Sequence, residues 1–137
     1  MFFSIIVVCY NAGEELRKTV ESIQNQTDTD YEIIVKDGAS TDGSLKQLQE
    51  DDRLRIYSSP DKGIYDAMNQ AVSYMNGRYA LFLNCGDYFY DDRVLETVHR
   101  AILENTVSKK EQPAVYYGNT FERKTGNVVN SNPKLDA

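Results

Sequence analysis

The chain has 137 residues, a length that forms one domain of ordinary size around a single core. Its hydrophobic fraction of 41% and charged fraction of 26% are typical of a soluble globular protein. The net charge of −6 argues against a nucleic-acid partner, because proteins that bind a phosphate backbone carry a basic patch. The apolar run 2–8 is far shorter than the ~20 residues of a membrane helix. The sequence therefore predicts a cytoplasmic chain without a transmembrane segment.

Three residues that commonly bind metals are assigned to structural roles. Cys9 and Cys85 are too few for a disulfide framework and lack the spacing of a zinc motif, so both are predicted to be reduced thiols. His99 has no second histidine or cysteine nearby on its predicted helix. We expect it to be a surface or half-buried residue and not a ligand.

The first predicted elements are a strand and a helix. Residues 2–10 form a near-continuous β-branched and aromatic run, typical of a strand buried on both faces of a parallel sheet. Residues 13–26 carry Leu16, Val20 and Ile23 at helical spacing, with acids in the first turn. The pattern then repeats, and predicts strands at 31–36, 54–57, 78–83 and 114–117, helices at 42–49, 63–74 and 92–103, and a hairpin turn at 124–127.

Strands that alternate with helices at this spacing predict one α/β domain. Its sheet is expected to be open and mostly parallel, with helices on both faces and right-handed crossovers. The helix at 42–49 is expected to turn Leu45 and Leu48 inward. The helix at 63–74 is expected to bury a stripe of apolar residues, namely Ile64, Ala67, Met68, Ala71, Val72 and Met75.

Polar residues collect where the predicted strands end. In an open α/β sheet, ligands bind outside the carboxyl ends of the strands. Residues 10–11, 37–38, 61–63 and 84–87 follow four successive strands, so their loops are expected to converge on one rim. No Gly-x-Gly-x-x-Gly follows the first strand and no P-loop motif occurs in the chain. Phosphates are therefore expected to be held through a metal ion or backbone amides.

The segment 81–87 (LFLNCGD) contains a candidate metal ligand. A predicted buried strand runs there into a polar turn that ends in the carboxylate of Asp87. Mg²⁺ and Mn²⁺ take oxygen ligands, commonly from one or two carboxylates and from substrate phosphates. The alternative interpretation is an ordinary turn built from Asn, Gly and Asp.

Four segments, in this order and at this spacing, resemble the nucleotide-sugar half of family 2 inverting glycosyltransferases. They are 4–11 (SIIVVCYN), 32–44 (EIIVKDGASTDGS), 60–69 (PDKGIYDAMN) and 83–87 (LNCGD), and the resemblance extends more weakly to 116–119 (YYGN). The resemblance implies a Rossmann-like GT-A fold. It also implies transfer from a nucleotide-diphosphate sugar, a UDP-sugar by preference, to an acceptor hydroxyl with inversion. Mg²⁺ or Mn²⁺ would be the cofactor, and synthesis of a surface polysaccharide or glycan the process.

The resemblance also assigns residues to the donor. It places Val8 and Tyr10 beside the nucleobase, Asn11 near the ribose or diphosphate, and Asp37 on the base. A carboxylate can accept the N3–H of uracil, and a tyrosine offers an aromatic face for stacking. Lys62 is a partner for the diphosphate under the same resemblance, with a solvated loop lysine as the alternative.

The turn 84–87 occupies the place of the family's Asp-x-Asp metal motif and departs from it. Asn84 and Gly86 stand where acids are common, so Asp87 is expected to be the one ionised metal ligand of this turn. The diphosphate would then supply much of the coordination. Asp42 matches a further acid of the family pattern, but we interpret it as a helix-start acid near Ser40 and leave it out of the site.

The general base that inversion requires lies in the acceptor-binding half of the family. Residues 1–137 are therefore expected to form a donor-binding domain that ends before that half. The parent enzyme is expected to act on a glycan or lipid-linked acceptor, with peripheral association at the inner face of the membrane. Two alternatives stay open: a sugar-phosphate nucleotidyltransferase, which would ordinarily show a Gly-rich loop after the first strand, and a non-catalytic nucleotide-sugar-binding module.

Overall fold

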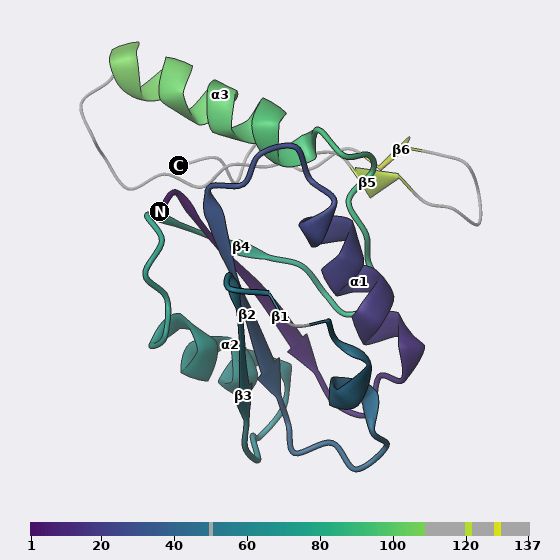
Figure 1. The fold of residues 1–137 in the computed structure, drawn as a ribbon. Coiled ribbons are helices and arrows are strands. Elements are labelled where there is room, and N and C mark those ends of the chain that lie inside the picture. Colours follow the sequence, from purple (N-terminus) through teal and green to yellow (C-terminus); the bar gives the residue numbers. More distant parts are fainter. Residues whose placement is uncertain (50, 109–119, 122–127, 130–137) are drawn as a thin grey trace. The chain divides into compact units, whose positions relative to one another are not determined.

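The computed structural model describes residues 1–49, 51–108, 120–121 and 128–129 (Figure 1). The chain forms two compact units, Met1–His99 and Arg100–Ala137. The strand predicted at 114–117 and the turn predicted at 124–127 lie outside the described residues.

A sheet of four parallel strands forms the centre of the first unit (Figure 1). In chain order its strands are β1 (Phe3–Cys9), β2 (Tyr31–Asp37), β3 (Leu54–Ser58) and β4 (Tyr79–Phe82). They lie in the order β3-β2-β1-β4, so the sheet grows in one direction from β1 to β3 and in the other to β4. The order of the strands therefore reverses beside β1, which is where open α/β sheets bind ligands. The predicted open parallel sheet is confirmed.

Helices cover both faces of this sheet. The helical elements are α1 (Glu14–Gln24), the 3₁₀ turn η1 (Ser44–Gln47), α2 (Ile64–Val72) and α3 (Val94–Ser108). Figure 1 shows α1 and α2 on opposite sides of the sheet. Ala67 and Ala71 of α2 pack against Ile6, Val8 and Ile34. The strand residues that alternate with these point to the other face and are also buried, namely Ile5, Val7, Ile33 and Val35.

Three predictions about packing were wrong in detail. The helix predicted at 42–49 is only the short turn η1, because Gly43 is left-handed (φ 80°) and Leu48 is extended; Leu45 and Leu48 are half-buried. Ile64 and Val72 do not belong to a buried stripe, since α2 packs through its alanines and leaves Ile64 59% exposed. The strand before the turn 84–87 was predicted to be buried, but β4 is only partly so, since alternate residues, Ala80 and Phe82, are exposed.

The second unit contributes a short pair of strands. β5 (Thr120–Phe121) and β6 (Val128–Val129) are antiparallel, and Thr120 lies opposite Val129. These strands flank the residues predicted to form a hairpin turn. Within the described ranges, no helix has both the length and the apolar character needed to cross a lipid bilayer.

Candidate functional site

A cavity of about 780 Å³ lies where the loops that follow the strands meet. Its walls include Val8 and Tyr10 from the end of β1, Gly38 after β2, Asp61 after β3 and Asn84 after β4. The predicted convergence of four loops is therefore present in the structure. Ile64 and Ala67 of α2 complete part of the apolar wall. An apolar cavity with a few polar groups at its rim is the usual form of a small-molecule site.

The predicted site residues divide into those that line this cavity and those that lie beside it. Val8, Tyr10 and Asn84 are lining residues, whereas Asn11, Asp37, Lys62, Gly86 and Asp87 are not among them. Tyr10 is 64% exposed and offers its ring to the cavity. An aromatic face that is open in this way can stack on a nucleobase.

The carboxylate of Asp37 is buried and its oxygens already have partners. Oδ1 accepts hydrogen bonds from the Cys9 thiol (3.4 Å) and the Ser40 hydroxyl, and Oδ2 from the Ser40 backbone N–H (2.8 Å) and the Ser58 hydroxyl (2.7 Å). A carboxylate has about four acceptor positions, so this set uses all of them. A base could bond to Asp37 only by displacing one of these donors. In this structure Asp37 joins the ends of neighbouring strands, and its contact with the base stays a prediction.

Hydrogen bonding also decides the ionisation of this group. Burial raises the pKa of the Asp37 carboxyl, but the bonds from Ser40, Ser58 and Cys9 together hold that pKa below its ordinary value. The contact between Asp37 and Cys9, which lowers the pKa of the carboxyl, raises the pKa of the thiol. Burial, and then the charge of Asp37, raise the pKa of Cys9 well above its ordinary value. Asp37 is therefore an anion and Cys9 a neutral donor.

Asn11 fastens the first loop to the second. It adopts a left-handed conformation (φ 47°), its Oδ1 accepts the backbone N–H of Thr41 (2.8 Å), and its own N–H donates to the hydroxyl of Ser40 (2.7 Å). Asp42 makes a second link, since its carboxylate accepts the backbone N–H groups of Gly13 (3.0 Å) and Ser44 (3.0 Å). The bond to Ser44 places Asp42 at the start of η1, in agreement with its interpretation as a structural acid.

The turn 84–87 presents one carboxylate to solvent. The backbone N–H of Asp87 donates to the carbonyl of Asn84 (2.9 Å), and Gly86 has the positive φ of 97° that such a turn requires at its third residue. Asp87 is exposed, and no described residue donates a hydrogen bond to its carboxylate. A hard divalent cation suits an oxygen ligand of this kind. Among the described residues, no three acidic, histidine or cysteine side chains form a cluster that could hold a metal alone.

One further residue near the site was missed by the sequence reasoning. Lys36 is fully buried at the end of β2, and its ammonium donates to the carbonyls of Asp37 (2.9 Å) and Ser59 (2.7 Å) and to Oδ2 of Asp61 (3.5 Å). The signal was present, because a lysine inside an otherwise apolar strand needs an acidic or carbonyl partner. Lys62, by contrast, is exposed, as a solvated loop lysine would be.

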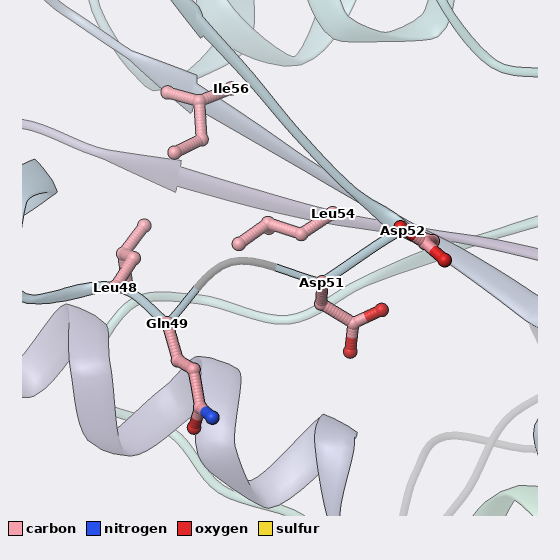
Figure 2. A pocket seen from close by; sticks show the side chains of 6 residues that line it. All are labelled: Leu48, Gln49, Asp51, Asp52, Leu54 and Ile56. Atoms are coloured by element: carbon pink, nitrogen blue, oxygen red, sulfur yellow. The ribbon is translucent and has the colours of Figure 1, made fainter.

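A second cavity, of about 350 Å³, lies away from these loops beside β3. Figure 2 shows its lining side chains, which come from residues 48–56. Asp51 within it accepts the backbone N–H of Arg53 (2.8 Å) and forms an ion pair with the guanidinium of the same residue (3.4 Å). The carboxylate of Asp51 therefore stabilises the local turn, and none of the predicted site residues lines this cavity.

Comparison with known proteins gives a consistent result. The family model described as "Glycosyl transferase family 2" matches residues 4–134. A "PGL/p-HBAD biosynthesis glycosyltransferase" of Mycobacterium bovis is 35% identical over 130 residues, which cover 90% of this chain and 48% of that protein. A chondroitin synthase of Pasteurella multocida is 31% identical, over 92% of this chain and 13% of its own length. The chain spans about half the length, or less, of these curated relatives.

Solved structures agree on the fold. The crystal structure of S. aureus TarS 1–349 in complex with UDP-GlcNAc superposes with a TM-score of 0.68 at 25% identity, covering 76% of this chain and 32% of that one. A TarS structure that covers 87% of this chain at 22% identity has a TM-score of 0.69. The Rossmann-like GT-A architecture is thereby confirmed.

Proposed function

Because the chain belongs to glycosyl transferase family 2, we propose that it binds a nucleotide-diphosphate sugar, a UDP-sugar by preference, for inverting transfer to an acceptor hydroxyl. The observation that carries the proposal is the 780 Å³ cavity at the carboxyl ends of the strands, beside the point where the strand order reverses. The TarS structures hold UDP-GlcNAc or UDP, which supports a uridine nucleotide as the donor.

We assign the residues as follows. The ring of Tyr10 stacks on the nucleobase, with Val8 and Asn84 forming walls of the same cavity. Asn11 holds the loop that faces the ribose and diphosphate, and Lys62 offers a cation to the diphosphate from its exposed position. Asp37 fixes the loop that carries Gly38 through its bonds to Ser40, and its predicted contact with the base stays part of the proposal.

Asp87 is the residue that would bind Mg²⁺ or Mn²⁺, with Gly86 shaping the turn that presents it. A bound divalent ion supplies positive charge to the leaving diphosphate. One carboxylate is an incomplete coordination shell, so the nucleotide and the ion are expected to bind together. Inversion also requires a general base for the acceptor hydroxyl, and we expect that base in an acceptor-binding half.

The acceptor is proposed to be a glycan or a lipid-linked sugar. Chondroitin synthase is among the relatives, which supports polysaccharide synthesis as the process. Peripheral association with the inner face of the membrane stays a prediction, as does the assignment of residues 1–137 to the donor-binding half.

Calorimetric titration with UDP tests the proposal. We expect tighter binding with Mn²⁺ or Mg²⁺ than with EDTA, and loss of that difference in Asp87→Ala. Asp91→Ala is the matched control, because Asp91 is an exposed acid a few residues away whose carboxylate accepts the backbone N–H of Arg93 (2.9 Å). Equal affinity with and without metal in the wild type would contradict the role of Asp87.

A further inference from the structure

We propose that Glu15 is a positioning residue for the turn 84–87, and that it acts through the hydroxyl of Tyr88. This inference rests on the proposed donor site, in which Asp87 binds the divalent ion, and it names a residue outside the turn on which binding of the ion depends. Glu15 lies in the first turn of α1, and Tyr88 directly follows Asp87 in the chain. The Tyr88 hydroxyl donates a hydrogen bond of 2.5 Å to Oε2 of Glu15.

One face of α1 carries a row of polar side chains. Glu15, Thr19 and Ser22 recur at helical spacing, each one position before an apolar residue that the helix buries. Gln26, two residues beyond the end of the helix, continues the row and is itself buried. Every member of this row makes a hydrogen bond to the chain that follows β4.

The chain that follows β4 runs beside α1 and is held along this row (Figure 1). The backbone N–H of Gly86 donates to the hydroxyl of Thr19 (2.9 Å), and the backbone N–H of Phe89 donates to the hydroxyl of Ser22 (3.4 Å). Gln26 holds the far end through two further backbone hydrogen bonds. The helix α1 therefore fixes the path of the chain out of the turn.

Glu15 adds a charged contact at the turn itself. A Cβ atom built on Gly86 would lie 3.8 Å from Oε2 of Glu15, so this oxygen lies against the turn. The other oxygen, Oε1, is 3.8 Å from the ammonium of Lys18 on the same helix. Hydrogen bonds to an ionised carboxylate are roughly twice as strong as those between neutral groups. The bond to Tyr88 is thus a strong link between α1 and the turn.

The two contacts hold the residues on either side of the proposed metal ligand. Thr19 holds Gly86, Glu15 holds Tyr88, and Asp87 lies between them. An exposed side chain that is ordered only on binding loses conformational entropy at that step, which weakens binding. Loss of the bond between Glu15 and Tyr88 should therefore weaken binding of the ion. Nucleotide binding without metal should not change.

The test measures UDP affinity by calorimetry, with Mn²⁺ and with EDTA, in the wild type, Glu15→Ala and Tyr88→Phe. Each variant should reduce the gain in UDP affinity on adding Mn²⁺ by about three- to tenfold, and should keep the wild-type affinity in EDTA. Glu15→Gln should keep most of the gain, because its side-chain carbonyl still accepts the Tyr88 hydroxyl. Glu14→Ala is the matched control: it removes an exposed acid from the same helical turn and should keep the full gain.

The double variant Glu15→Ala/Tyr88→Phe tests whether the two residues act as one unit. Both substitutions remove the same hydrogen bond, so the double variant should lose no more of the gain than either single variant. Additive losses would show that the residues act separately and would overturn the inference. A loss of UDP affinity in EDTA as large as the loss with Mn²⁺ would show general damage to the site, and would also overturn it.

The remaining outcomes separate this inference from the proposed function. If the wild type does not bind UDP, the proposed donor site and this inference both fail. If UDP binds with a gain from Mn²⁺ that Glu15→Ala and Tyr88→Phe both keep, the donor site stands and the inference is overturned. If Glu15→Gln loses as much as Glu15→Ala while Tyr88→Phe loses nothing, the charge of Glu15 acts on the ion directly, and positioning through Tyr88 is overturned.

Discussion

The hydroxyl of Ser58 donates a hydrogen bond to the carboxylate of Asp37 at 2.7 Å, and the two residues are paired at the ends of neighbouring strands. The same carboxylate holds Ser40 in the loop that follows β2 and Cys9 at the end of β1. One buried anion thus joins three chain segments, and its partner Cys9 lines the cavity. Removal of the Asp37 carboxylate should therefore lower the free energy of unfolding more than it changes ligand affinity.

Asp37→Ala is expected to lower the free energy of unfolding by about 2–4 kcal/mol, because several buried donors lose their common acceptor. Urea unfolding measures the change. Asp87→Ala is the matched control, since Asp87 is exposed and should cost less than about 0.5 kcal/mol. A stable Asp37→Ala variant with selectively weakened UDP binding would show that Asp37 acts by contacting the base and not by stabilising the fold.

The pH dependence of stability follows from Asp37 and Glu32. Burial raises the pKa of each carboxyl, but hydrogen bonds more than offset it: those to Glu32 come from the hydroxyl of Ser4 (2.6 Å) and the backbone of Asn76 and Gly77. Each folded-state pKa therefore lies below its unfolded value, ordinarily 4.5 for Glu32 and 3.8 for Asp37. Their stabilisation is complete above these values and is lost as the pH falls through the lower folded-state values.

Denaturant unfolding at a series of pH values tests this. Asp37 and Glu32 should leave the free energy of unfolding unchanged above about pH 5.5, and this free energy should decline below about pH 4.5. Glu32→Gln should decline less steeply with acid, because one of the two low-pKa groups is gone. A variant as acid-sensitive as the wild type would show that Glu32 takes no part.

The sequence was most informative about β1, β2 and the helix α1, since hydrophobic periodicity acts over a few neighbouring residues. It also located the four polar loops. It did not reveal that Asp37 bonds to Ser58, or that Lys36 points at Asp61, because those partners lie 21 and 25 residues apart and depend on the register of β2 with β3. The loops could be located from the local sequence pattern. The hydrogen-bond partners of each carboxylate could not, because they depend on which strands pair and in which register.

Asn11 should tolerate glycine better than alanine. Its φ of 47° strains a residue that has a Cβ atom, and its side chain accepts the N–H of Thr41. Asn11→Gly loses the hydrogen bond but relieves this strain, whereas Asn11→Ala loses the hydrogen bond and keeps the strain. We expect alanine to be about 1 kcal/mol less stable than glycine by urea unfolding. Equal stability of the two variants would show that backbone strain at residue 11 does not affect the free energy of unfolding.

Gly77 is required by contact and not by backbone conformation. A Cβ atom at this position would lie 2.6 Å from backbone atoms of both Phe3 and Ser4, which cannot rotate away. Gly77→Ala should therefore lower the free energy of unfolding by about 3 kcal/mol. Gly43→Ala is the contrasting control: nothing lies within 4 Å of its Cβ position, so only its φ of 80° counts and about 1 kcal/mol is expected. Similar costs at the two positions would refute the contact argument.

Cys9 should be an unreactive thiol, and Asp37 should be part of the reason. Burial raises the pKa of Cys9 first, and the adjacent Asp37 charge and hydrogen bond raise it further. Only the thiolate is nucleophilic, so in a Cys85→Ser background Cys9 should react with iodoacetamide at pH 9 at least about 100-fold more slowly than glutathione. Adding Asp37→Asn removes the negative charge and should increase the rate.

The comparison with the second variant separates charge from access. Burial alone would slow the reagent equally in the Cys85→Ser protein and in its Asp37→Asn derivative, provided that both remain folded by circular dichroism. A pH profile distinguishes the cases further, because a raised pKa moves the rise in alkylation rate to higher pH, whereas a blocked thiol lowers the rate at every pH. If Asp37→Asn leaves the profile unmoved, the Asp37 charge does not control Cys9, and this carboxylate acts through its hydrogen bonds alone.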